Sequence, residues 1–206
     1  MADLPLDFPS DLAQRLAAVL DIEGKIPRAL DALGALAGRD VVLLDGAGGL
    51  RAAQLTELGA RVRSLDASGL EGNDLLDGSA DALVGCWCEV LAFEPAEKAE
   101  AERIVRPGGR LLAIHDYGRD DVSSLRPDAA ERPEYGLWSR RDGPFLSAGF
   151  KVRVVHCWWT FDSVETAQAF VRDAFGESGR QFADELRRPR LSYNIAVYHR
   201  TIGEAA

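Results

Sequence analysis

The chain has 206 residues, of which 47% are hydrophobic and 28% charged, and its formal net charge is −9. This length fits one domain whose hydrophobic core is stable without disulfides. The acidic balance argues against binding to a nucleic-acid backbone, and no apolar run approaches the roughly 20 residues that cross a bilayer. The N-terminus lacks the basic start and apolar core of a signal peptide. We therefore expect a cytoplasmic protein without a nucleic-acid or membrane partner.

Three cysteines, Cys86, Cys88 and Cys157, bear on redox and metal chemistry. Their odd number gives no disulfide framework. Three thiolates could in principle ligate zinc, but Cys86 and Cys88 are better interpreted as small residues at the end of a buried strand. We expect no metal site.

Strand and helix signals alternate along the chain. Two amphipathic helices are predicted over residues 10–20 and 24–38. Strands are predicted from apolar runs at residues 41–44, 61–65, 81–86, 110–114, 150–156 and 193–199. Helices are expected between them at residues 50–58, 95–105 and 143–148, with a helical insertion at 163–188. The polar segment 118–142 is predicted to be a long surface segment that could act as a lid.

This alternation predicts a mostly parallel sheet with helices on both faces. The last two strands are expected to be antiparallel neighbours at the far edge. In such sheets, ligands bind at the carboxyl ends of the central strands.

Four ordered segments carry a resemblance to a known family. They are Val42 through Asp66, Asp77-Gly78-Ser79-Ala80-Asp81-Ala82-Leu83-Val84, Arg103-Ile104-Val105-Arg106-Pro107-Gly108-Gly109-Arg110-Leu111 and Ser147-Ala148-Gly149-Phe150-Lys151-Val152. Together they resemble the motifs of class I S-adenosylmethionine-dependent methyltransferases. The resemblance implies one Rossmann-like, three-layer α/β domain over 1–206, with N-terminal helices in 1–38 and a cofactor-binding core over 41–117. It also implies S-adenosylmethionine as cofactor and a small-molecule substrate.

The first motif predicts where the cofactor binds. A glycine turn lets the backbone approach a ligand closely, and the residues implied are Asp45, Gly46, Ala47 and Gly48. Asp66 lies about 20 residues beyond the turn, at the separation of the acid that binds a ribose in the dinucleotide fold. With Ala67 it completes the nucleoside side of the predicted site. A nicotinamide cofactor is disfavoured, because Arg51 stands where its fingerprint needs a glycine.

The first motif departs from the family pattern at two positions. Leu44 occupies the place of the usual acid, and Leu50 that of a third glycine. Asp45 is displaced by one residue, so its side chain is expected to point to the opposite face of the strand. Alternatively, the turn is slipped by one residue and Gly49 is used.

The link between the second and fourth family strands is short. Residues 67–80 have room for one crossover, so we predict that the family's third strand is missing. The expected order is 2-1-4-5-7-6 in family numbering, with an antiparallel final strand. Asn73 and Asp74 are candidates for binding the adenine, or they cap a turn.

Further candidate cofactor-binding residues, Cys86 and Trp87, and the candidate catalytic residues follow the central strands. Cys86 and Trp87 are placed at the mouth of the site, where Trp87 flanks the adenine or the substrate, or packs against the next helix. His115, Asp116 and Tyr117 form the strongest candidate for a general-base cluster, although polar residues are also common at strand ends.

Two functions remain open from the sequence. The first is methyl transfer to a small molecule. The second is a non-catalytic methyltransferase-like protein that has lost cofactor binding and acts as a binding or regulatory subunit, as the departures at Leu44 and Leu50 could indicate. The oligomeric state is not predicted.

Overall fold

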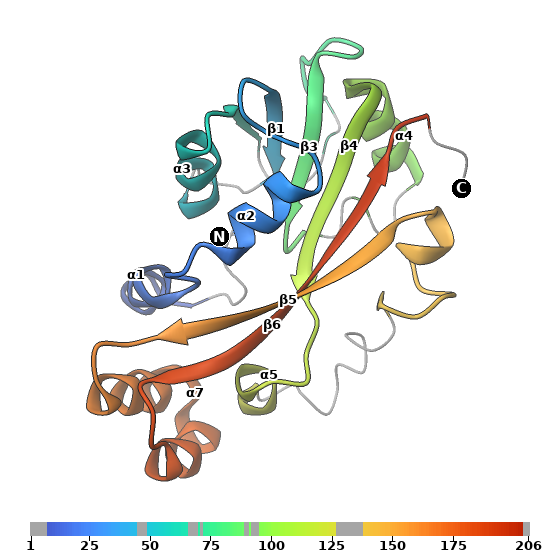
Figure 1. Ribbon diagram of the computed structural model, residues 1–206. Coiled ribbons are helices and arrows are strands. Elements are labelled where there is room, and N and C mark those ends of the chain that lie inside the picture. The colour runs from blue at the N-terminus through green and yellow to red at the C-terminus, as the bar shows by residue number, and fades with distance from the viewer. Residues whose placement is uncertain are drawn as a thin grey trace.

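The computed structural model describes residues 8–44, 49–65, 70, 72–88, 91, 95–126 and 138–203. Its centre is a six-stranded sheet in the order β2-β1-β3-β4-β6-β5 (Figure 1). The strands are β1 (Asp40–Leu44), β2 (Arg61–Leu65), β3 (Ala80–Cys86), β4 (Val105–Asp116), β5 (Lys151–Thr160) and β6 (Arg190–Thr201). The strands from β2 to β4 are parallel, and β6 runs antiparallel to both β4 and β5.

The predicted fold class is confirmed. The observed order corresponds to 2-1-4-5-7-6 when β3, β4, β5 and β6 take the places of the family's fourth, fifth, sixth and seventh strands. The described residues between β2 and β3 contain no strand, as the short link predicts.

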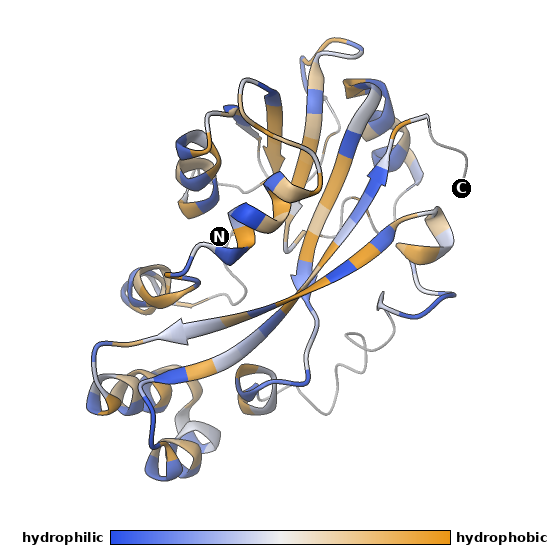
Figure 2. Cartoon of the chain, in the orientation of Figure 1, coloured by the Kyte–Doolittle hydropathy of each residue, from blue (hydrophilic) through white to orange (hydrophobic). Residues whose placement is uncertain are grey.

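Helices cover both faces of the sheet. They are α1 (Ser10–Val19), α2 (Lys25–Ala32), α3 (Leu50–Glu57), α4 (Pro95–Ile104), α5 (Asp121–Leu125), the 3-10 helix η1 (Leu146–Ala148) and α7 (Val164–Glu185). Buried side chains form two clusters, and alternation along β1 divides them: Val41 and Leu43 belong to one, Val42 and Leu44 to the other. The first cluster includes the apolar sides of α1, α2, α3 and α7, and the second that of α4. Hydrophobic residues accordingly colour much of β1, β3 and β4, whereas β5 and β6 are mixed (Figure 2).

Two predicted boundaries were wrong. Helix α2 ends at Ala32 and not near residue 38, because the Asp31 carboxylate accepts the Leu36 N–H at 2.8 Å and turns the chain. The Pro107-Gly108 turn lies within β4, where Gly108 adopts a φ of 80° and donates to the Ile202 carbonyl at 2.9 Å. A proline and two glycines are therefore accommodated as an irregular start to β4.

The insertion and the candidate lid contact the distal half of the sheet. Helix α7 begins at the Ser163 cap and contains a non-helical Gly176. At the start of the candidate lid, Asp120 and Asp121 accept the backbone N–H groups of Asn194 and Ser192, each at 2.8 Å. The segment up to Arg126 is thus fastened to β6, and residues 127–137 lie outside the described residues.

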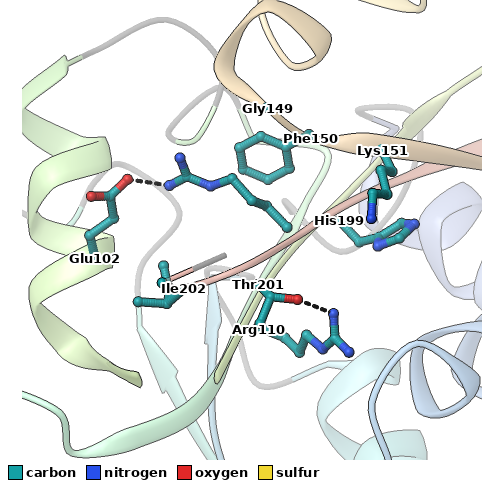
Figure 3. A pocket seen from close by; sticks show the side chains of 10 residues that line it. Glu102, Arg110, Gly149, Phe150, Lys151, His199, Thr201 and Ile202 are labelled. Atoms are coloured by element: carbon teal, nitrogen blue, oxygen red, sulfur yellow. Dashed lines mark hydrogen bonds and ion pairs between the residues drawn. The ribbon is translucent and has the colours of Figure 1, made fainter. Parts of the chain in front are cut away.

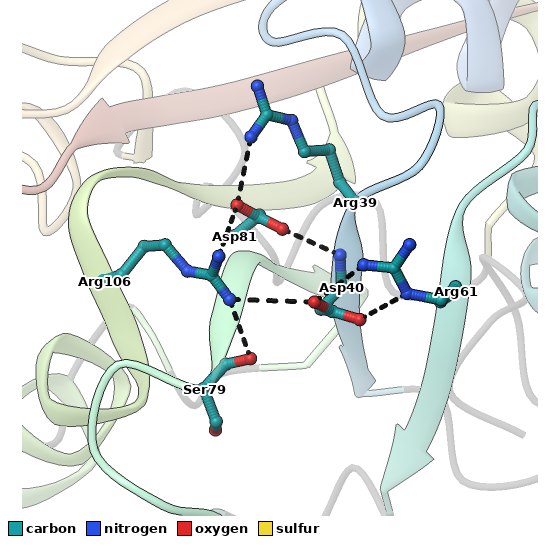
Figure 4. A network of polar contacts seen from close by, with 6 residues as sticks. All are labelled: Arg39, Asp40, Arg61, Ser79, Asp81 and Arg106. Carbon is teal, nitrogen blue, oxygen red and sulfur yellow. Dashed lines mark hydrogen bonds and ion pairs between the residues drawn. The ribbon is translucent and has the colours of Figure 1, made fainter.

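A network of ion pairs fixes the amino ends of the parallel strands (Figure 4). Asp81 of β3 accepts the Asp40 N–H of β1 at 2.9 Å and pairs with Arg39 and Arg106 at 3.3 and 3.2 Å. Arg61 of β2 binds both carboxylate oxygens of Asp40, at 2.7 and 2.9 Å. The network leaves the carboxyl ends of the same strands free for other contacts.

No helix in the described part of the chain is long and apolar enough to cross a membrane.

Candidate functional site

The carboxyl ends of β1 and β3 define the place where a ligand is expected. Leu44 of β1 pairs with Gly85 of β3, and the chain continues from β1 toward β2 but from β3 toward β4. Such a switch point opens a crevice beyond the strand ends. The predicted cofactor residues Asp45, Gly46, Ala47, Gly48, Asp66 and Ala67 lie outside the described residues, so their roles stay predictions.

Trp87 is held at this edge in an unusual backbone conformation. It follows β3 with a φ of 50°, which is rare for a bulky residue and common at functional sites. Its backbone N–H donates to the Ile114 carbonyl, and its indole Nε1 donates to Asp116 Oδ1, both at 2.8 Å. The half-buried indole is therefore fixed through both its backbone and its side chain, and it packs against the first core cluster.

Asp116 joins three elements at the end of β4. Its side chain is 4% exposed and accepts hydrogen bonds from Trp87, from the Tyr193 hydroxyl of β6 and from the Arg126 guanidinium that follows α5. Burial, and then the Asp116 charge, raise the pKa of Tyr193 well above its usual value, so the hydroxyl keeps its proton and donates. Asp116 thus serves as an anchor for the ring of Trp87.

Arg51 is a functional candidate that the sequence interpretation missed. It lies in the first turn of α3 and is completely buried. Its guanidinium carbon lies 5.7 Å from the centre of the Trp87 ring, and Nη1 donates to Gln54 Oε1 at 2.5 Å. Among the described residues, its Nε and Nη2 have no hydrogen-bond partner. The signal was present, because Arg51 is four residues before the buried Leu55 and so shares the inward face of α3.

A buried guanidinium with few hydrogen-bond partners is costly unless its charge is compensated. Desolvation of an uncompensated charge costs several kcal/mol (about 3–5 when a partner is removed). The nearby Asp21 carboxylate accepts the N–H groups of Lys25 and Ile26 at 2.9 and 2.7 Å, which starts α2, and it makes no ion pair with Arg51. Among the described residues, no carboxylate compensates the charge of Arg51.

The cysteines do not form a common site. Cys86 and Cys88 pack in different core clusters, and Cys157 lies on β5, from which β4 and β6 separate β3. All three are buried and form no disulfide. The pKa of Cys157 is raised to about 12, mainly by burial. The described residues hold no group of three or more side chains suited to a metal ion.

His115 and Asp116 do not come together. Neighbouring residues of a strand point to opposite faces, and the His115 ring lies 4.2 Å from the Trp138 ring and 5.3 Å from the Phe145 ring, in the other core cluster. Tyr117 packs on that cluster too. Burial lowers the pKa of His115 to about 3, so its ring is neutral and weakly basic. The three residues therefore do not form one cluster, and a catalytic role for any of them stays a prediction.

Asn73 and Asp74 make contacts within the protein. The Asn73 amide donates to the Leu70 carbonyl at 2.5 Å and to Glu100 at 2.8 Å, and its oxygen accepts the Leu75 N–H at 2.8 Å. Asp74 is 81% exposed and pairs with Arg63. These contacts are those of a capped turn, and binding of the adenine by either residue stays a prediction.

Comparisons with known proteins concern the fold. No protein-family model and no curated protein matches the sequence. Among solved structures, the chain is similar to a chain of the complex between the Haloferax volcanii Trm112 methyltransferase activator and a candidate methyltransferase (TM-score 0.56, 18% identity, 95% of this chain and 93% of that chain covered). It is also similar to a candidate type II methyltransferase from Anaeromyxobacter dehalogenans (TM-score 0.53, 18% identity, 87% and 96% covered). A third is a candidate methyltransferase from an antibiotic biosynthesis pathway of Anabaena variabilis (TM-score 0.52, 16% identity, 88% and 98% covered). The chain therefore has the fold of class I methyltransferases.

Proposed function

We propose that this chain is an S-adenosylmethionine-dependent methyltransferase that acts on a small molecule. The observation that carries the proposal is the buried Arg51 guanidinium at the carboxyl edge of the sheet, with two nitrogens that lack hydrogen-bond partners among the described residues. The fold and the sequence resemblance support the same conclusion.

The residues at this edge fit the chemistry of the cofactor. S-Adenosylmethionine carries a carboxylate, which a guanidinium binds through two parallel hydrogen bonds. Arg51 would hold that carboxylate, and the Trp87 ring would pack against the adenine or the substrate. Asp116 holds the indole in place through the 2.8 Å hydrogen bond from Nε1.

The contribution of the chain is mainly binding and alignment. When bound, the cofactor supplies an activated methyl carbon on a positively charged sulfur. Arg51 fixes one end of the cofactor and Trp87 restricts the volume beside it, which lowers the entropy cost of bringing the two reactants into line. Asp116 already accepts three hydrogen bonds, so its role is to position Trp87.

Calorimetric titration of the full chain tests this proposal. Wild type should bind S-adenosylmethionine and S-adenosylhomocysteine, and Arg51→Met should weaken both by about 10–100-fold, since a hydrogen bond to a charged group is worth about 1.5–3 kcal/mol. 5′-Methylthioadenosine, which lacks the amino-acid part, should bind wild type and Arg51→Met equally. This difference assigns Arg51 to the carboxylate.

Arg180→Met provides the matched control, because Arg180 is exposed on α7 and pairs with Glu177 at 2.7 Å. It should bind all three ligands like wild type. Without ligand, Arg51→Met should unfold at a higher denaturant concentration than wild type, because an uncompensated buried charge is removed. Absence of binding to wild type even at millimolar concentration would overturn the proposal and favour the non-catalytic alternative.

A further inference from the structure

A cavity lies at the end of the sheet opposite the candidate cofactor site. It has a volume of about 340 Å³ and is formed where β4 and β5 begin and β6 ends (Figure 3). Arg110 lines it, whereas Asp116 marks the other end of β4. At about 3.3 Å per residue, the two positions on this strand are roughly 20 Å apart. The cavity is therefore separate from the proposed methyl-transfer site.

Basic side chains converge on one face of the sheet at this cavity. The register pairs Arg110 with Thr201 and Lys151 with His199. Paired residues share a face, and His199 also pairs with Leu112, two residues beyond Arg110, so all four point to the same side. Arg153 lies two residues after Lys151 and joins them on that face. In Figure 3, Lys151 and His199 lie side by side, and Arg110 is directed to Thr201.

The basic groups of this cluster have no acidic partners in the described part of the chain. Arg110, Lys151 and Arg153 make no ion pair there, although other arginines, such as Arg61 and Arg103, pair with carboxylates. Glu102, the carboxylate that lines the cavity, is bound to Arg200. The side of the cavity formed by Arg110, Lys151 and His199 is thus basic in a chain whose net charge is −9, whereas Arg200 and Glu102 lie on the other side of β6.

Three further observations show that this charge is concentrated and that Arg110 is held in place. Burial and then the charges of Arg110, Lys151 and Arg153 lower the pKa of His199. The stem of Arg110 lies against Gly34, where a Cβ atom would come within 3.0 Å of Arg110 Cγ. Arg110 also donates to the Thr201 hydroxyl. The guanidinium is therefore positioned, and not only exposed on a flexible stem.

We propose that this cavity binds a small phosphorylated molecule, with its phosphate or pyrophosphate between Arg110, Lys151 and His199. A guanidinium, an ammonium and an imidazole together match a multiply charged phosphate better than a single carboxylate. The acidic surface elsewhere disfavours an extended polyanion such as a nucleic acid. This inference does not depend on the proposed function.

Nuclear magnetic resonance of the histidine rings in the full chain tests it. Inorganic pyrophosphate, titrated at constant ionic strength, should shift the His199 signals saturably and raise the pKa of this ring by about one unit or more, because an opposite charge nearby favours the protonated form. His115, buried in the core, and His156, toward the other end of β5, are internal references whose signals should stay unchanged.

Matched lysine variants separate a built site from general screening. Lys151→Gln should weaken pyrophosphate binding about tenfold, as expected for loss of a charge-assisted contact, whereas Lys98→Gln on α4 should leave it unchanged. Lys151 is exposed, so the variant is expected to fold. The proposal is overturned if sodium chloride alone reproduces the His199 shift, if both variants behave alike, or if a short single-stranded oligonucleotide shifts His199 and pyrophosphate does not.

Discussion

At the scale of single residues, His115 is a titratable group in an apolar environment. Its side chain lies among Trp138, Phe145 and Tyr198, and its Nε2 has no hydrogen-bond partner among the described residues. Burial lowers its pKa to about 3. The native state therefore holds the neutral ring at pH values where an unfolded histidine binds a proton.

The stability of the protein should fall as the solution becomes acidic for this reason. Below about pH 6.5 the unfolded chain takes up a proton that native His115 does not, so the free energy of unfolding decreases by up to about 1.4 kcal/mol per pH unit. His115→Leu should show a flatter dependence between about pH 5 and 6.5, measured by urea unfolding. At pH 8 the histidine is unprotonated in both the native and the unfolded state. A difference in the free energy of unfolding between the two proteins at that pH therefore measures the change in packing. Parallel profiles of the two proteins would contradict the expectation.

At the scale of elements, the strands are pinned to one another at their amino ends. Asp81 connects β3 to β1 through the Asp40 N–H, and its side chain is only 12% exposed. It also carries the negative charge between Arg39 and Arg106. This single side chain therefore satisfies a backbone donor and compensates two cations.

Removing that side chain should destabilise the sheet. Asp81→Ala is expected to lower the free energy of unfolding by about 1–3 kcal/mol, because a partly buried donor loses its acceptor. Asp81→Asn should cost less, since the amide oxygen can still accept the Asp40 N–H. Asp77→Asn is the control: Asp77 also pairs with an arginine but is 83% exposed, and exposed pairs contribute about 0–1 kcal/mol. Chemical denaturation measures all three, and equal losses would contradict a special role for Asp81.

The strands and their order could be predicted because each depends on a short stretch of sequence. Apolar runs mark β1 and β3, and the short 67–80 link leaves no room for another strand. Strand alternation also predicts that the side chains of His115 and Asp116 point to opposite faces of the sheet. The interpretation of His115, Asp116 and Tyr117 as one cluster did not take this alternation into account. The contact between Trp87 and Asp116 could not be predicted, because it depends on the positive φ of Trp87 as well as on the pairing of β3 with β4. The inward position of Arg51 follows from its four-residue spacing from Leu55, whereas the contact of its guanidinium with the Trp87 ring depends on how α3 packs beside the end of β3.

At the scale of the whole molecule, charge is distributed unevenly over an acidic protein. The proposed phosphate cavity and the proposed cofactor site lie at opposite ends of β4, and each contains a cation without a carboxylate partner among the described residues. The net charge of −9 thus says little about the ligands of the individual sites.

The absence of a further strand leaves β2 as the outermost described strand on that side of the sheet. An open strand edge presents backbone donors and acceptors that can pair with another chain, and charged side chains are a common protection against such pairing. Arg61 and Arg63 are exposed on β2 and bind Asp40 and Asp74. Their positions suit this protective role.

The exposed edge of β2 is therefore expected to need protection against pairing with another chain, and Arg61 and Arg63 provide it. The double substitution Arg61→Val and Arg63→Val should leave the chain folded but make it self-associate as concentration rises, as detected by light scattering. Replacement of both arginines by lysine should leave the association state the same as that of wild type. The positive charge, and not the shape of the guanidinium, is what opposes pairing with the edge strand of another chain. Unchanged light scattering from the valine variant would mean that other features protect the exposed edge of β2. In the expected case, the solubility of this protein depends on two arginines of an edge strand.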